Sequence, residues 1–326
     1  MQISQDFFLK NRFVVMRLAR DLFSTDLDQR LHTVDEYSEE LKVSRGTVQK
    51  ALQLLVDNKC ITTYFRGHLG NYLIAKDNDK LWEYSGFGTL TGAMPIPLGE
   101  LAQGIATGVC DCMNANNVPF NCVFIQGGYT RLKGLGQHKY DFIIASYLTS
   151  RVVKESYPEL EEIMKLPGCI YGGQYLLYFA DIEKKQIEDG MRVAVDPSSI
   201  DQLTLTHMLC EGKKNIQYVE TTYFDTHYCV KDGRADVTVS RTDTLASFYL
   251  DKQNQAHAEE RDAHAKELPV LEGYTRREME LFNTTVVLAS RDNYGMASLL
   301  SKTLRPSVIS HAQKQVVNGT RIPSYY

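Results

Sequence analysis

The sequence lacks several features that would place a protein in a class at once. Its seven cysteines are an odd number without a Cys-x-x-Cys pair, and Cys110-Asp111-Cys112 is too tight for a usual structural zinc site. No stretch approaches the ~20 apolar residues of a membrane span, and the first residues lack the basic and apolar regions of a secretion signal. We therefore expect reduced cysteines, no bound metal, no membrane association and a cytoplasmic location.

Signatures of common enzymes are also missing. The sequence has no Gly-x-Ser-x-Gly, no phosphate-binding Gly-x4-Gly-Lys-Ser/Thr and no His-Glu-x-x-His. Two groups of neighbours could still imitate a metal or nucleophile site: His257, Glu260 and His264, and Asp225, His227 and Cys229. Such proximity in sequence is far more often ordinary surface or core than catalysis. We expect no catalytic residues and no cofactor.

Neither sign of charge dominates. The chain carries 36 Lys and Arg against 40 Asp and Glu, and residues 1–75 hold 10 basic and 9 acidic side chains. A composition of 43% hydrophobic and 23% charged residues is that of a globular protein, and 326 residues suffice for two or three compact units. Counterion release would give one such N-terminal domain only modest affinity for DNA, so a homodimer that occupies adjacent half-sites is expected.

What the sequence does contain is an amphipathic helix over residues 44–57. Ser44 is a good N-cap residue, and Val48, Leu52, Leu55 and Val56 recur at helical spacing. The first turns are polar, which is where a helix in the DNA major groove places its base-reading side chains. The candidate DNA contacts of this helix are Ser44, Arg45, Thr47, Gln49 and Lys50.

The flanking segments complete a helix-turn-helix with a wing. Thr33 can cap a short helix over residues 34–41, and the connection at residues 42–43 allows only a sharp corner. Residues 60–65 and 71–75 predict two strands joined by Arg66-Gly67-His68-Leu69-Gly70. Thr33, Arg66 and His68 are added to the candidate DNA contacts, and the two wing residues are expected to bind phosphates.

This order of elements resembles the winged N-terminal domain of GntR-type transcription regulators. Ser44-Arg45-Gly46-Thr47-Val48 matches the Ser-Arg-x-Thr-Val opening of that family's recognition helix, whereas the glycines Gly67 and Gly70 stand further apart than in its wing. Gln49 and Lys50 fall where its members usually have Arg and Glu. With the residues after Leu90, the whole chain looks like a YhfZ-type member of that superfamily. The resemblance implies a winged helix followed by a domain similar to the periplasmic ligand-binding proteins.

The domain boundary is expected in a short charged run. Residues 76–80 contain no apolar side chain, so we place a linker at residues 76–87, between a domain of residues 1–75 and one of residues 88–326. From Leu90 and again from Met191, strands alternate with helices, which predicts an α/β fold of two lobes with parallel strands. We expect residues 251–267 to form a helix that is solvated or, less often, covered by a partner, and residues 284–304 to return to the first lobe.

Polar groups that follow strands are the candidates for ligand binding, because helix N-termini at the carboxyl ends of parallel strands favour anions. Asp196-Pro197-Ser198-Ser199 fits such a site and equally fits a simple helix cap, and Arg241 fits an anion partner or a surface ion pair. The candidate ligand contacts are Gly127, Gly128, Tyr129, Ser146, Tyr147, Tyr175, Ser198, Ser199 and Arg241. A small polar or anionic effector is expected to close the two lobes on each other.

These patterns favour a ligand-responsive DNA-binding transcription regulator. The winged helix would read a double-stranded DNA operator as a homodimer, and the C-terminal cleft would bind the effector. A purely structural DNA-binding protein and an enzyme that acts in the cleft, with an accessory DNA-binding domain, are the alternatives.

Overall fold

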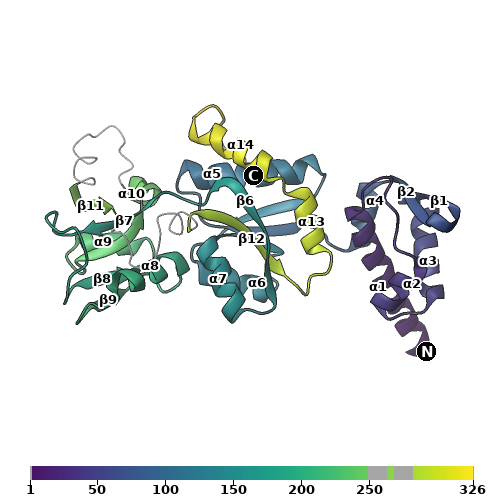
Figure 1. The fold of residues 1–326 in the computed structure, drawn as a ribbon, viewed down its shortest axis with the longest axis horizontal. Helices are drawn as coiled ribbons and strands as arrows, with labels where there is room; N and C mark the ends of the chain where they lie inside the picture. Colours follow the sequence, from purple (N-terminus) through teal and green to yellow (C-terminus); the bar gives the residue numbers. More distant parts are fainter. Residues whose placement is uncertain (1, 249–262, 268–281, 326) are drawn as a thin grey trace. The chain divides into compact units, whose positions relative to one another are not determined.

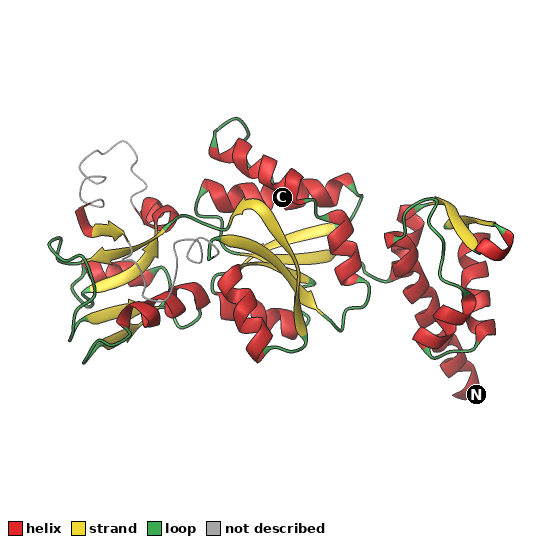
Figure 2. Cartoon of the chain, viewed as in Figure 1, coloured by secondary structure: helices red, strands yellow, loops and turns green. Residues whose placement is uncertain are grey.

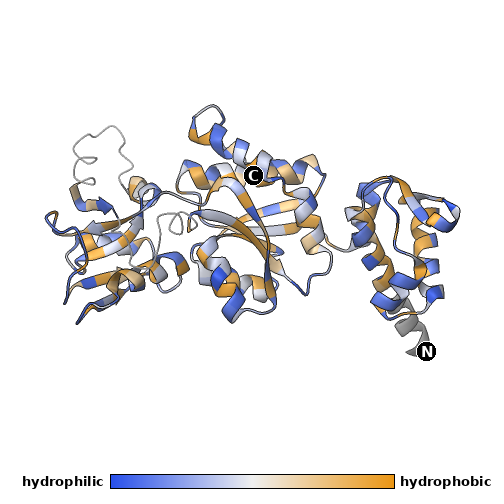
Figure 3. Ribbon diagram, in the orientation of Figure 1, coloured by the Kyte–Doolittle hydropathy of each residue, from blue (hydrophilic) through white to orange (hydrophobic). Residues whose placement is uncertain are grey.

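The computed structural model describes residues 2–248, 263–267 and 282–325, which form two compact units (Figure 1). The first unit gathers residues 1–90, 113–120 and 291–304, and the second holds residues 91–112, 121–290 and 305–326. Figure 2 shows the strands of the second unit gathered in two sheets. Figure 3 shows apolar residues along the strands of both sheets and along the helices that pack on them.

Within the part of the chain that the structure describes, no helix is long and apolar enough to cross a membrane.

The first unit contains the predicted winged helix-turn-helix. Its elements are α1 (Gln2–Ser24), α2 (Val34–Leu41), α3 (Arg45–Asp57), β1 (Ile61–Phe65), β2 (Asn71–Lys76), α4 (Asn78–Ser85) and α13 (Met296–Thr303). Strands β1 and β2 pair antiparallel, as expected for a wing. Its core is a cluster of buried side chains from α1 to α4 and the hairpin, among them Leu18, Leu22, Tyr37, Val48, Leu55, Leu73 and Leu81.

Helix α4 corrects the expected linker at residues 76–87. The Asp77 carboxylate accepts a hydrogen bond from the Lys80 amide at 3.1 Å, so the charged run is the cap and first turn of a helix. Leu81 and Trp82 are buried, and the Trp82 ring lies 5.4 Å from that of Phe23 on α1. This helix could not be predicted from the sequence because its first turn is polar and solvated, and only its second turn packs in the core.

The chain re-enters the first unit after the last strand of the second. The Tyr294 hydroxyl donates a hydrogen bond to Glu40 Oε1 of α2 at 2.9 Å. The Arg17 guanidinium lies 3.0 Å from the centre of the Tyr294 ring. Arg20 donates to the Tyr294 carbonyl oxygen at 2.8 Å. The helix of this segment, α13, begins only at Met296, because residues 291–295 form a turn that ends at Gly295 (φ +79°).

The second unit has two five-stranded sheets, and each sheet with the helices that pack on it is here called a lobe, lobe 1 or lobe 2. Lobe 1 has the strand order β4-β3-β5-β12-β6 and lobe 2 the order β11-β7-β10-β8-β9. The strands are β3 (Leu90–Met94), β4 (Phe120–Phe124), β5 (Phe142–Ser146), β6 (Leu160–Ile170), β7 (Tyr175–Phe179), β8 (Arg192–Val195), β9 (Gln217–Glu220), β10 (Val237–Arg241), β11 (Ala265–Glu267) and β12 (Thr284–Ser290). The helices are α5 (Glu100–Ala115), α6 (Gly128–Gly136), α7 (Tyr147–Ser156), α8 (Ile200–Cys210), α9 (Asp225–Lys231), α10 (Thr242–Phe248) and α14 (Pro306–Val317).

Both sheets are mixed, which corrects the expectation of parallel strands alone. The strands joined by helices do pair in parallel, as in β3–β5, β8–β9 and β8–β10. Strand β12 pairs antiparallel with β5 and β6, and β7 pairs antiparallel with β10. Residues 265–267 form β11 rather than the end of a solvated helix, while residues 251–262 of that prediction lie outside the described residues.

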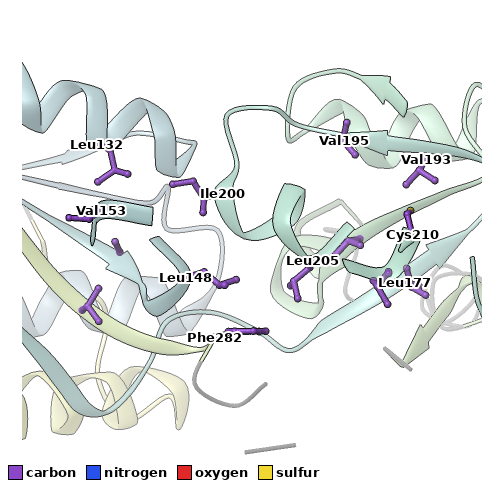
Figure 4. Packing of buried hydrophobic residues seen from close by; sticks show 14 of the residues in the cluster. Leu132, Leu148, Val153, Leu177, Val193, Val195, Ile200, Leu205, Cys210 and Phe282 are labelled. Atoms are coloured by element: carbon purple, nitrogen blue, oxygen red, sulfur yellow. The ribbon is translucent and has the colours of Figure 1, made fainter. Parts of the chain in front are cut away.

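One apolar cluster spans the two lobes (Figure 4). Leu132 of α6 and Leu148 of α7 belong to lobe 1, while Ile200 and Leu205 lie on α8 of lobe 2. The Tyr129 amide donates to the Ser198 carbonyl oxygen at 3.0 Å, so a backbone hydrogen bond also joins the lobes. The second unit is thus in a closed arrangement.

Glycines let α5 and α14 pack closely, and we expect Gly104→Ala to lower the stability of the second unit. A methyl group at Gly104 would lie 2.5 Å from Gln313 Cα, a backbone atom that cannot rotate away. Overpacking of this kind costs roughly 1–3 kcal/mol. Urea unfolding followed by circular dichroism would measure the loss. Gly46→Ala, where no atom lies within 4 Å of the added methyl group, is the control; equal midpoints for the two variants would contradict the close packing.

Candidate functional site

The recognition helix α3 presents a polar face at its first turns. Val48, Ala51 and Leu55 are buried, which turns Arg45, Gln49 and Lys50 to solvent. Thr47 is half-buried, and its amide and hydroxyl both bond to the Ser44 hydroxyl, at 3.3 and 2.9 Å. Ser44 and Thr47 therefore cap the helix, while Arg45, Gln49 and Lys50 have the exposure that contact with base edges requires.

An exposed ion pair holds Arg45 in the free protein. Its Nη1 atom lies 3.0 Å from Asp35 Oδ1, with the two side chains 65% and 56% exposed. Such surface pairs contribute about 0–1 kcal/mol, so Arg45 can exchange Asp35 for a base at little cost. Asp35 stands in the first turn of α2. The pair thus joins the first turn of α2 to the first turn of α3.

Thr33 forms a full capping box at the start of α2. Its hydroxyl accepts from the Glu36 amide at 3.2 Å, and the Glu36 carboxylate accepts from the Thr33 amide at 2.6 Å. These hydrogen bonds lower the pKa of Glu36. The structure gives Thr33 this capping role, and its contact with DNA stays a prediction.

The wing carries its two predicted phosphate contacts and an apolar tip. The Arg66 guanidinium lies 4.3 Å from the centre of the Tyr72 ring, and His68 is exposed in a short 3-10 turn over Gly67–Leu69. Phe65 is 70% exposed and Tyr64 58%. These two aromatic residues were not among the predicted DNA contacts, although aromatic side chains next to a glycine turn are a signal for an exposed hairpin end.

The second candidate site is a cleft between the two lobes of the second unit. Its volume is about 70 Å³, and since roughly 10–15 Å³ of such space holds one water molecule, it has room for a small ligand. The polar residues that line it are Gln126, Arg131, Tyr171, Tyr175, Ser199, Asp201, Gln202, Tyr223, Ser240, Arg241, Asp243 and Thr244. They stand at the ends of β4, β6 and β10 and at the starts of α6, α8 and α10. This is the place where a ligand of an open sheet is expected.

Five of the nine predicted ligand contacts line this cleft, namely Gly127, Gly128, Tyr175, Ser199 and Arg241. The other four, Tyr129, Ser146, Tyr147 and Ser198, are not among its lining residues. Ser146 instead caps α7 and donates a hydrogen bond to Asp201, while the Lys165 ammonium lies 4.5 Å from the centre of the Tyr147 ring. Ser146 thus acts on the cleft only through Asp201.

The turn before α8 is built by Asp196 rather than by a serine cap. The Ser198 amide and hydroxyl both donate to the Asp196 carboxylate at 2.9 Å, and Ser199 is the N-cap residue of α8 without a side-chain hydrogen bond to that helix. Ser198 packs against Gly127, where a Cβ atom would come within 2.4 Å of the serine Oγ. The two sequence segments that were expected to face each other are therefore in contact.

Arg241 lies in a buried ion pair, not in a surface one. Its side chain is 8% exposed, its Nη2 atom lies 3.6 Å from Asp201 Oδ2, and it donates to the Tyr175 hydroxyl. The guanidinium also lies 4.0 Å from the centre of the Tyr175 ring and 5.1 Å from that of Tyr171. Burial disfavours its charge, but Tyr175 and Asp201 outweigh burial and raise the pKa of Arg241. Arg241 stays a cation deep in the cleft.

Four further residues line the cleft that were not predicted from sequence, namely Arg131, Asp201, Tyr223 and Asp243. Tyr223 shares a hydrogen bond with Thr244 at 3.0 Å, and burial raises its pKa to about 12. Asp243 accepts from the Gly173 amide at 2.9 Å. Arg131 had a signal: it follows Gly127 by four residues, so it lies one helical turn further along the face that begins in the cleft.

Lobe 2 also contains Asp225, His227 and Cys229, whose spacing in sequence imitates a nucleophile set. Cys229 and His227 are buried, Asp225 is exposed at the start of α9, and none of the three lines the cleft. His257 and Glu260 lie outside the described residues. In the described part of the chain, no group of three His, Cys, Asp or Glu side chains is arranged to hold a metal ion.

We expect His227 to make the stability of lobe 2 depend on pH. Burial lowers the pKa of His227 from 6.5 to about 4. Between pH 4 and pH 6.5 this side chain is therefore protonated in the unfolded chain and neutral in the folded protein. The stabilisation is complete above pH 6.5 and is lost as the pH falls toward 4. Thermal unfolding across this range should show a steeper loss for the wild type than for His227→Gln. A variant at the exposed His311 should behave as the wild type, and equal slopes for all three proteins would refute the assignment.

Comparison with known proteins places the chain in a family. A family model described as the YhfZ C-terminal domain matches residues 77–325, and one described as a helix-turn-helix domain matches residues 28–73. The uncharacterized protein YhfZ of Escherichia coli strain K12 is 26% identical over 325 residues, which are 98% of this chain and 99% of that protein.

A solved structure has a similar fold. The crystal structure of YhfZ from Shigella flexneri has a TM-score of 0.58 at 23% identity and covers 76% of this chain and 98% of its own. The periplasmic aliphatic sulphonate binding protein SsuA of Escherichia coli has a TM-score of 0.47 at 14% identity over 71% of this chain and 75% of its own. The predicted YhfZ-type organisation, a helix-turn-helix followed by a two-lobed α/β domain, is confirmed.

Proposed function

Since the chain belongs to the YhfZ family, whose C-terminal domain covers most of it, we propose that it is a ligand-responsive transcription regulator. The observation that carries this proposal is the presence, in one chain, of a helix-turn-helix and of a cleft lined by two buried arginines. The exposed face of α3 reads the operator, and the cleft binds a small effector. Ligand binding then alters affinity for DNA only if the ligand prefers one arrangement of the protein.

A continuous series of contacts supports a route from the cleft toward the DNA-binding unit. Asp201 in the cleft accepts from Ser146 at the end of β5, and Ser146 is the register partner of Thr285 on β12. Strand β12 leads directly into the segment that carries Tyr294, which bonds to Glu40 of α2. A shift of α8 on ligand binding would thus act on β12 and, through the backbone, on the helix-turn-helix.

Three finer features belong to the same proposal. The winged helix is of the GntR type, as the Ser44 to Val48 motif indicates. The regulator is a homodimer, because the nearly balanced charge of residues 1–75 gives one domain little affinity for DNA. It acts in the cytoplasm. A protein that remains a monomer and protects a single half-site would contradict the dimer.

The experiment begins with the operator and then seeks the effector. Selection from a random double-stranded DNA library gives the preferred sequence, and thermal unfolding with a panel of metabolites gives the ligand. An effector at a hundred times its dissociation constant adds about 2.7 kcal/mol of stability. In fluorescence anisotropy it should change operator affinity several-fold to about a hundredfold, which corresponds to 1–3 kcal/mol of coupling.

Two outcomes would overturn the proposed function. A ligand that stabilises the protein but leaves operator affinity unchanged would make the protein a binder without a regulatory response. Turnover of the ligand, detected by mass spectrometry of the reaction mixture, would instead favour an enzyme in the cleft. Selection that yields no preferred DNA sequence would remove the operator from the proposal.

A further inference from the structure

Arg131 is a buried cation for which the described residues provide no carboxylate partner. Its side chain lines the cleft and is 3% exposed. Nη1 donates to the Ile125 carbonyl oxygen at 2.6 Å and Nη2 to the Tyr171 hydroxyl at 2.7 Å. Its Nε atom is buried and has no hydrogen-bond partner. Since buried charges in folded proteins are normally paired, a charge left in this condition marks a place for a counter-ion.

The two carboxylates of the cleft are already engaged. One oxygen of Asp201 accepts from Ser146 and the other lies 3.6 Å from Arg241. The oxygens of Asp243 accept from the Gly173 and Thr244 amides, both at 2.9 Å. Arg241 therefore has an acidic partner, whereas no carboxylate among the described residues neutralises the positive charge of Arg131.

The cleft also has more hydrogen-bond donors than acceptors. A guanidinium carries five N–H groups, and among the described residues only two of those of Arg131 reach an acceptor. The Tyr171 and Tyr175 hydroxyls each accept from an arginine, and no acceptor among the described residues takes the proton of either. Burial raises the pKa of both tyrosines, so both keep that proton. A ligand that completes these contacts must bring acceptors.

We propose that the cleft binds a small organic anion whose oxyanion head group, a carboxylate, phosphate or sulfonate, is held by Arg131 and the Tyr171 hydroxyl. Arginine can hold such oxygens in a bidentate pair, and Arg131 keeps N–H groups for which the described residues provide no acceptor. The N-terminus of α6, at Gly127 and Gly128 on the cleft wall, adds a favourable dipole. The inference rests on the proposed function in one respect, that the same cleft holds the effector.

The volume of the cleft limits the size of this anion. About 70 Å³ admits on the order of five water-sized groups, so the ligand is a metabolite of few non-hydrogen atoms rather than a nucleotide. Beyond the head group it meets Tyr175, Tyr223 and Thr244 on lobe 2. Contacts from both lobes are therefore made at once, which favours the closed arrangement.

The test uses the full chain and three simple oxyanions. Sodium acetate, sodium phosphate and sodium methanesulfonate are compared with sodium chloride at equal ionic strength in thermal unfolding. At least one oxyanion should raise the melting temperature of the wild type with a saturable concentration dependence. Arg131→Gln should weaken that binding by about tenfold or more, because a charged hydrogen-bond donor is lost. Lys133→Gln, which removes an exposed positive charge from the same helix, should retain it.

The matched variants separate a site from a general salt effect. Salts that stabilise proteins by exclusion from the surface act on all three proteins alike, and an equal response of Arg131→Gln and Lys133→Gln would overturn the proposal. If Arg131→Gln fails to fold, the Nε–H resonance of Arg131 in the wild-type protein, assigned with Arg131→Lys, should shift on titration with the anion. An unmoved resonance would equally overturn it, and the identity of the effective ion tells carboxylate from phosphate and sulfonate.

Failure of this inference and failure of the proposed function give different results. If an oxyanion binds through Arg131 but no effector alters DNA affinity, the anion site stands and the regulator does not. If a neutral ligand alters DNA affinity equally in the wild type and Arg131→Gln, the regulator stands and the anion site is wrong.

Discussion

Arg45→Ala should lower affinity for the selected operator by roughly five- to a hundredfold, while affinity for random DNA changes little. The physical reason is that a bidentate contact of arginine with a guanine edge is worth about 1–3 kcal/mol of discrimination. Arg45 is the first residue of α3, exposed, and held only by its weak pair with Asp35. Loss of that pair costs the folded protein little, so the effect should fall on DNA recognition rather than on stability.

Fluorescence anisotropy with the selected operator and with a shuffled sequence would measure this ratio. Arg12→Ala is the matched control, since Arg12 is an exposed cation of the same unit on α1. It should affect both DNA sequences equally or not at all. An equal loss on both sequences in Arg45→Ala would make Arg45 a phosphate contact, and no loss on either would remove it from the interface.

The second large effect is expected at Gly127, where alanine should abolish the response to the effector. Gly127 has φ +88°, which strains any side chain, and an added Cβ would meet Ser198 Oγ at 2.4 Å and the Ser198 carbonyl oxygen at 3.0 Å. The lobes must then separate and lose the hydrogen bond from Tyr129 to Ser198. An effector that needs both lobes would bind weakly or without closure, whereas operator affinity in its absence should be that of the wild type.

Gly190→Ala separates backbone strain from the contact between lobes. Gly190 has φ +79° but no atom within 4 Å of an added Cβ, so it carries the same kind of strain without the steric clash. Operator binding with and without effector should distinguish the two variants, and small-angle scattering should show an expanded second unit for Gly127→Ala alone. A normal effector response in Gly127→Ala would mean that closure at Ser198 is not required.

Local signals made much of the fold predictable from sequence. The bounds of α2 and α3 agree closely with those predicted, because Thr33 and Ser44 are clear N-cap residues. Strand β6 was not predicted, since Leu160–Ile170 contains charged residues and Pro167 and lacks a clear alternation. Its place in the sheet depends on pairing with β12, which lies more than a hundred residues away. Long-range pairing of this kind leaves no local pattern.

The sites were predictable where they depend on the start of a helix and not where they depend on tertiary contacts. Ser44 and the polar face of α3 follow from capping and periodicity. The ion pair of Arg241 with Asp201 joins β10 to α8, and the contact of Arg131 with Tyr171 joins α6 to the end of β6. Neither partner could be chosen from sequence because the residues of each pair are 40 positions apart. Ser198 lies in the turn before α8, as predicted, but its hydroxyl donates a hydrogen bond to Asp196 and does not line the cleft.

The return of residues 291–304 to the first unit has a consequence for modularity. A fragment that ends at residue 90 would leave Glu40 without the Tyr294 hydroxyl, Arg20 without the Tyr294 carbonyl oxygen, and Asp26 without its 3.0 Å ion pair with Lys302. The first unit is therefore completed by residues 291–304, which follow the last strand of the second unit in the sequence. A chimera that joins residues 1–90 to another domain would lack part of this unit. Transfer of the helix-turn-helix with its full set of contacts would therefore require α13 and the turn that precedes it as well.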